Sequence, residues 1–98
     1  MAMASRLTKM ERRILTYADD MVVGNDSIAA KNLAIPSDAV THTLQNLLAA
    51  GLLDTIDLET GVVIYSHTRK VTREMLDEET HYRFGGRPRH IYPISDPQ

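Results

Sequence analysis

Four uncharged polar side chains follow one another at helical spacing in the middle of the chain: Thr41, His42, Gln45 and Asn46. Residues one, four and five positions apart lie on neighbouring parts of one helix face. Asn and Gln amides can pair with adenine through two hydrogen bonds, and a Thr methyl group can pack on the methyl of thymine. With Ser37 at its start, this face could read the base sequence of DNA. A merely solvated helix face would show the same residue types.

Binding DNA also requires cations, because most of the affinity comes from lysine and arginine on phosphates. Residues 32–68 contain no lysine or arginine and four acidic side chains, within a chain of formal net charge −2. The cations must therefore come from outside this stretch. Candidates are Arg87 and Arg89 in the glycine-flanked segment, Lys31, and the basic cluster within residues 5–14. The mildly acidic total argues against strong indiscriminate binding to DNA.

The arginines among these cations also have structural alternatives. Arg87 and Arg89 could belong to a charged turn beside Gly85 and Gly86. The arginines of the basic cluster could form ion pairs with nearby carboxylates. The pairs in question join Arg12 or Arg13 to Glu11, Asp19 or Asp20.

Other chemistry has little support. The histidines at 42, 67, 81 and 90 lack the spacing of metal ligands, and there is no cysteine. No carboxylate lies in a recognisable acid–base or nucleophile motif. We therefore expect no metal, no cofactor and no enzymatic activity. The absence of a long apolar run or a signal peptide predicts a cytoplasmic protein without membrane contact.

Two helices are indicated before the polar face. Thr8 and Glu11 have capping-box spacing, and apolar residues recur through Met21, which predicts a helix over about 9–22. Residues 24–26 then provide a turn. Ile28 can lie in a short strand or fill the core, and residues 29–34 make little more than one helical turn and a half.

Residues 37–50 have the clearest helical pattern in the chain. Pro36 cannot continue the preceding helix, so a new one should begin near Ser37 or Asp38. Apolar residues of this helix form one stripe, and Gly51 is placed to end it in the left-handed conformation. The stripe consists of Val40, Leu44, Leu47 and Leu48.

The remainder of the chain indicates strands and one ambiguous segment. Residues 52–58 and 62–65 have strand patterns, and the sequence ETG between them suits a hairpin turn. Residues 71–84 fit a helix through Val71, Met75 and Tyr82, or a solvated loop. A glycine-rich tip at 85–90 then precedes a strand over 91–94, which Pro93 restricts to an edge.

Three segments together resemble a winged-helix DNA-binding domain of the MarR, PadR and IclR kinds: LTKMERRIL, LAIPSDAVTHTLQNLLAAGLLD and GGRPRHIYPIS. This resemblance implies an α+β fold with a three-helix winged helix-turn-helix and a C-terminal β-hairpin wing. The stretch before Val40 is about one turn shorter than in those families. The long piece before Gly85 leaves room for an extra hairpin or helix between residues 59 and 84.

A length of 98 residues predicts a single domain, residues 1–98. The resemblance implies that this domain regulates transcription by binding double-stranded DNA. The helix over 37–50 would enter the major groove, and the arginine wing at 85–90 would contact the minor groove or the backbone. Action as a repressor and a homodimer are expected, whereas any small-molecule effector stays open. The alternative is a winged helix used for protein–protein association in a replication, transcription or phage–host complex, because the middle of the chain is acidic.

Overall fold

The computed structural model describes residues 7–85 and begins with α1, Lys9–Ala18. The predicted capping box is present, because the Thr8 hydroxyl accepts from the Glu11 N–H and the Glu11 carboxylate accepts from the Thr8 N–H. The helix ends earlier than the predicted residue 22. Asp20 has a φ of 72°, and residues 20–23 run along a strand, so their backbone groups bond outside the helix.

The second and third helices, α2 (Asp26–Leu33) and α3 (Ser37–Ala49), pack against each other. Ala34, at φ 58°, ends α2, and Pro36 occupies the N-cap position of α3. The predicted start of the third helix is thus confirmed, although no side chain caps it. Ile28 is 51% exposed on α2, so the prediction that it lies in a strand or in the core is wrong.

The inner face of α3 follows the predicted apolar stripe. Val40, Leu44 and Leu47 are buried, and Leu48 packs against the same core. Gly51 has the left-handed φ of 79°, and the Leu52 N–H donates to the Leu47 carbonyl at 3.0 Å. The chain therefore turns sharply at the end of α3, as the glycine predicts.

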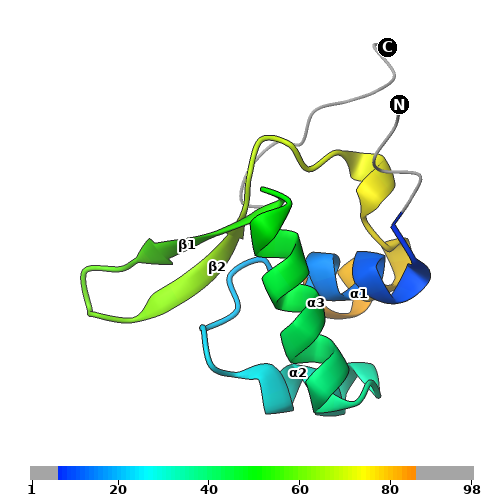
Figure 1. Cartoon of the computed structure of the whole chain (residues 1–98), viewed down its shortest axis with the longest axis horizontal. Coiled ribbons are helices and arrows are strands. Elements are labelled where there is room, and N and C mark those ends of the chain that lie inside the picture. The colour runs from blue at the N-terminus through cyan, green and yellow to red at the C-terminus, as the bar shows by residue number, and fades with distance from the viewer. Residues whose placement is uncertain (1–6, 86–98) are drawn as a thin grey trace.

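A β-hairpin follows directly, formed by β1 (Leu53–Asp57) and β2 (Val63–His67). The strands are antiparallel, and Ile56 lies opposite Ile64. This hairpin, with its turn before Val62, matches the two predicted strands. Val22 forms a bridge to Ile64 on the other edge of β2, which explains why α1 stops early. Figure 1 shows the hairpin extending away from the helices.

Short helical segments follow the hairpin. A 3-10 turn (η2, Arg73–Met75) is followed by α4 (Glu78–Thr80) and a π-helical turn (η3, His81–Gly85). Extra helical structure between 59 and 84 is thus confirmed. Val71 and Met75 are buried, but Tyr82 is 89% exposed and does not share their face.

Asp77 begins α4 and is buried rather than solvated. Its carboxylate accepts hydrogen bonds from the N–H and the hydroxyl of Thr80, and Lys9 Nζ lies 3.5 Å away. Its own N–H donates to the Thr16 hydroxyl on α1. Burial alone would raise the pKa of Asp77, but the hydrogen bonds from Thr80 and the Lys9 charge outweigh it and lower the pKa. Asp77 therefore connects the start of α4 to α1.

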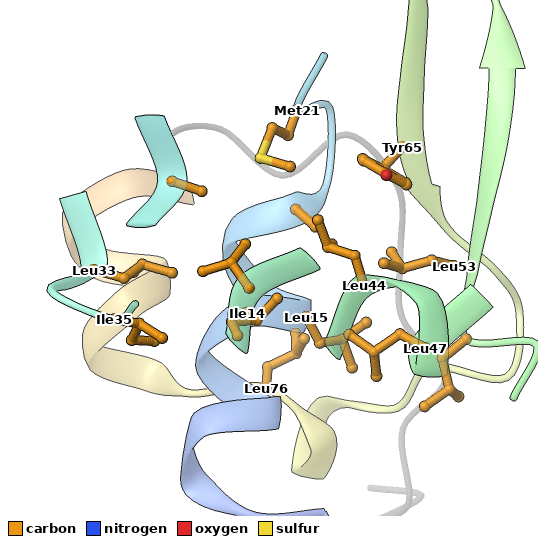
Figure 2. Packing of buried hydrophobic residues seen from close by; sticks show 14 of the residues in the cluster. Ile14, Leu15, Met21, Leu33, Ile35, Leu44, Leu47, Leu53, Tyr65 and Leu76 are labelled. Atoms are coloured by element: carbon orange, nitrogen blue, oxygen red, sulfur yellow. The ribbon is translucent and has the colours of Figure 1, made fainter. Parts of the chain in front are cut away.

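One core joins the helices to the base of the hairpin (Figure 2). Ile14 and Leu15 of α1 meet Leu44 of α3, and Leu53 and Tyr65 close the core from the strands. Full burial of such side chains stabilises the fold by roughly 1.5–3 kcal/mol each. The position of the hairpin relative to α3 is therefore set by the same contacts that stabilise the whole fold.

The fold is α+β, with four helices and a two-stranded antiparallel hairpin among the described residues. The predicted fold class is confirmed at that level. The hairpin lies at 53–67, directly after α3. The predicted wing tip at 85–90 has only Gly85 inside the described residues, and the return strand at 91–94 lies outside them.

Candidate nucleic-acid interface

The outward face of α3 carries all five of the helix positions predicted to read bases, and each is exposed: Ser37, Thr41, His42, Gln45 and Asn46. The opposite face of the helix is buried against α1 and the hairpin base. Because buried contacts fix the helix backbone, the exposed side chains are presented from a rigid element. The structure therefore brings these five residues together on one surface.

Thr41 is held by a contact that the sequence did not reveal. Its hydroxyl donates to the Asp26 carboxylate on α2 at 2.6 Å. The hydroxyl proton is therefore already used, and only the oxygen lone pair and the methyl group of Thr41 remain for a base. The same bond ties the outer edges of α2 and α3 together and places a carboxylate beside the proposed reading face.

Asp38 is the one charged side chain of α3, and it is exposed in the first turn. A carboxylate there interacts favourably with the positive end of the helix dipole. Its role in the folded chain is thus to stabilise the helix. Toward a polyanion it acts in the opposite direction, so cations elsewhere must provide the attraction to phosphate.

Lys31 is exposed in the last turn of α2, as a phosphate contact requires. The other two cations predicted with it to contact phosphate, Arg87 and Arg89, lie outside the described residues. Of these three predicted cations, only Lys31 lies within the described residues.

Arg12 and Arg13 of the basic cluster each donate a hydrogen bond to a backbone carbonyl. Arg12 donates to the Leu76 carbonyl at 2.9 Å, and Arg13 donates to the Leu33 carbonyl at 2.7 Å. Both are half-buried. These bonds to backbone carbonyls connect α1 to α2 and to the segment before α4. The contacts described for both arginines are thus with backbone carbonyl groups, and the ion pairs considered from the sequence stay a prediction.

Arg69 and Lys70 were missed from the sequence, although they end the long stretch without cations. Both are exposed directly after β2. Lys70 Nζ lies 3.0 Å from the position that a Cβ atom on Gly51 would occupy. It therefore lies over the C-terminal end of α3, where a cation also interacts favourably with the helix dipole. Only the turn at Gly51 brings this lysine to the helix.

The described hairpin does not have the positive charge predicted for a wing. Its strands and turn carry Asp54, Asp57 and Glu59 and no lysine or arginine. Its tip, at residues 58–62, is exposed. This hairpin therefore repels phosphate, and the arginines expected for a wing belong to a later segment.

The histidines of the described chain do not gather into a site. His67 is buried at the end of β2, with Nε2 2.7 Å from the Leu15 carbonyl oxygen and Nδ1 3.8 Å from Asp19 Oδ2. These contacts fasten β2 to α1. His42 is exposed on α3. Over residues 7–85, no three side chains of the metal-ligating types lie together.

Comparison of the chain with protein-family models, curated proteins and solved structures finds no match. None of the helices in the described part of the chain combines the length and the apolar character needed to cross a bilayer. What the surface of α3 can do must therefore be argued from its own geometry.

Proposed function

We propose that this chain is a winged helix-turn-helix domain that binds double-stranded DNA with α3 in the major groove. The order of the elements supports this assignment. A helix, a bridged segment at Val22, two helices joined by a tight turn at Ala34–Pro36, and a hairpin follow one another. This order puts α3 beside the hairpin, as a winged helix requires.

The observation that carries the proposal is the outward face of α3. Gln45 and Asn46 can each pair with adenine through two hydrogen bonds, and His42 can donate or accept one. Thr41 offers its methyl group to thymine, since its proton is held by Asp26. Each good two-bond contact is worth about 1–3 kcal/mol of discrimination between bases. The base sequence of the DNA would thus be read by a helix without a positively charged side chain.

Attraction to phosphate would come from cations around α3. Lys31, Arg69 and Lys70 are exposed among the described residues, and Arg87 and Arg89 would add to them. For about three phosphate contacts, affinity should fall by roughly 1.6 powers of ten over a fourfold rise in salt. This is weak for one subunit. A two-fold homodimer on a palindrome, with half-sites about 34 Å apart, would supply the rest.

A domain of this kind would act in the cytoplasm as a transcriptional regulator. A repressor needs only to occlude a promoter by binding to it. We therefore propose repression as the mode of action.

Selection from a random-sequence DNA pool at moderate salt tests the proposal. The wild type should enrich a palindrome. Gln45→Ala should relax the preference at one base position in each half-site, with about a 10-fold loss of affinity for the best site, as expected for one lost base contact. Arg87→Ala with Arg89→Ala should weaken binding to all sequences alike. Enrichment of no sequence by the wild type would refute the assignment.

A second candidate, protein association, is favoured by the hairpin. Its acidic side chains and exposed apolar residues suit a protein better than DNA. In that case the purified chain would shift no DNA, and Ile56→Asp would release a stoichiometric protein partner while Gln45→Ala would not. A DNA shift that depends on Gln45 would exclude it as the main function.

A further inference from the structure

The hairpin has an apolar face directed away from the core. Ile56 lies opposite Ile64 in the strand register, and Val22 lies opposite Ile64 on the other side. Directly opposite residues have side chains on the same face of a sheet, so these three form a row across it. Leu58 and Val62, joined by a 2.7 Å backbone hydrogen bond, extend the same face toward the tip.

This outer sheet face, made of Val22, Ile56, Leu58, Val62 and Ile64, is apolar and open. Ile56 is 43% exposed and Leu58 is 41% exposed, whereas Leu53 and Tyr65 on the opposite face are buried in the core. Single exposed apolar residues are ordinary on a protein surface, but a contiguous group of five indicates a contact site.

Three carboxylates lie on the hairpin, one of them on this face. Asp54 lies on the same side as Ile56, two residues earlier, and Asp57 and Glu59 follow near the tip. No lysine or arginine occurs between residues 32 and 68. An occupant should therefore present apolar side chains together with cations and few carboxylates. A second copy of the hairpin is disfavoured, because it would bring the same carboxylates against each other.

The free edge of β1 is less available to another polypeptide segment than the outer sheet face. The hydrogen bonds between Leu58 and Val62, and between Thr68 and Leu52, show that even-numbered positions pair with β2. The Thr55 N–H therefore points to the free edge, where it donates to the Asp54 carboxylate at 2.9 Å. This bond hinders the addition of another strand. Contact through the face is favoured over contact through the edge.

We propose that residues 87–94 of the same chain dock on the outer sheet face. This segment has the required chemistry: two arginines, then three large apolar side chains, with no acidic residue before Asp96. The apolar residues are Ile91, Tyr92 and Ile94. Pro88 and Pro93 lack N–H donors, so the segment suits packing on a face better than pairing at an edge.

The end of the described chain lies within reach of this face. The Phe84 ring packs against the Tyr17 ring at 5.2 Å between centroids. Tyr17 lies five residues before Val22, a separation of at most about 17 Å along the chain. Ile91 lies seven residues beyond Phe84, which allows an extended span of about 24 Å. The extended span from Phe84 to Ile91 exceeds the greatest separation of Tyr17 and Val22 along the chain, so Ile91 is proposed to contact the Val22 end of the outer sheet face.

Docking in this way would also reduce the negative charge of the hairpin. In the absence of DNA, Arg87 and Arg89 would lie near the side of the sheet that carries Asp54, and their charges would offset its carboxylates. The contact stands on the apolar face and its charge pattern alone, so it does not depend on DNA binding. All measurements below are made without DNA.

A nitroxide on Ser95→Cys tests the contact, because the chain has no other cysteine. In the full chain, the label should broaden the amide signals of Ile56, Ile64 and Val22 more than those of the outward face of α3. Ile56→Asp should abolish this selective broadening, whereas Thr55→Asp, on the opposite face of β1, should leave it. Arg87→Glu with Arg89→Glu should weaken it without affecting the described core.

Mixing two samples identifies the occupant. Chain that carries the nitroxide but no isotope enrichment is mixed with isotope-enriched chain that carries no nitroxide. Docking within one molecule predicts no broadening in this mixture. Broadening in the mixture equal to that in the single sample would assign the face to the tail of a second copy and overturn the proposal. Equal broadening of α3 and the hairpin, or none on either, would overturn it as well.

Discussion

The outward face of α3 and the outer sheet face have opposite chemistry. On α3 the exposed residues are amides, hydroxyls and an imidazole, whereas the sheet exposes valine, leucine and isoleucine bordered by carboxylates. Both are held by the same core, through Leu44 on one side and Tyr65 on the other. The difference shows that one small domain presents two surfaces of different chemistry, and we propose that the polar one contacts bases and the apolar one a polypeptide segment.

The largest expected effect comes from the inner side of α3. Leu44→Ala should lower the free energy of unfolding by about 2–5 kcal/mol, because it leaves a cavity between α1, α3 and the sheet. Gln45→Ala, one residue further along, should change it by less than about 0.5 kcal/mol. Urea denaturation of both variants measures this contrast. Comparable losses in the two variants would mean that the outward face is not simply solvated.

An intermediate effect is expected from the joint between α1 and α4. The pKa of Asp77 is lowered in the folded chain, so its carboxylate contributes stability that is present above the unfolded value near 3.9. That contribution is lost as the pH falls through the folded pKa. Asp77→Asn should cost about 1 kcal/mol at pH 7, because it weakens the N-cap of α4.

Acid titration separates this joint from the two surfaces. Below pH 4 the wild type should lose stability more steeply than Asp77→Asn, so the difference between them should shrink. Thermal unfolding at a series of pH values provides the measurement. A difference that stays constant down to about pH 2 would show that the charge of Asp77 is not what stabilises the joint.

An effect of similar size distinguishes a covered sheet face from a bare one. If residues 87–94 dock as proposed, Ile56→Thr should cost about 1 kcal/mol through lost apolar burial. Thr55→Ser, on the other face of β1, should stay within about 0.5 kcal/mol. Denaturation curves of the two variants measure these changes in the free energy of unfolding. An effect of Ile56→Thr no larger than that of Thr55→Ser would indicate a face open to water.

The parts of the fold that the sequence predicted well are those with local signals. The capping pair Thr8 and Glu11 starts α1, and Pro36 and Gly51 bound α3. The two strand patterns separated by a glycine-containing turn became β1 and β2. The five exposed positions on α3 also follow from helical spacing alone. Each of these predictions depends on residues within a few positions of one another.

Other features of the fold could not be predicted because the residues that contact each other are distant in the sequence. Residues 20–23 have helix-compatible apolar spacing, yet β2 captures their backbone groups. Arg12 meets the Leu76 carbonyl, and Lys70 lies over Gly51. Asp77 is buried by Thr16 and Lys9. No local pattern marks such contacts, so the sequence could not show which charged side chains bond within the fold.

By itself, the sequence determined where the third helix begins and ends, which of its faces is polar, and that a hairpin follows it. These properties arise from backbone preferences and from the period of apolar residues, both of which act over one or two turns. Only the tertiary structure decided which cations remain exposed, where α1 stops, and that a row of apolar side chains lies across the outside of the sheet. Those outcomes depend on strand pairing and on carbonyl groups brought near by folding, which act between segments far apart in the chain.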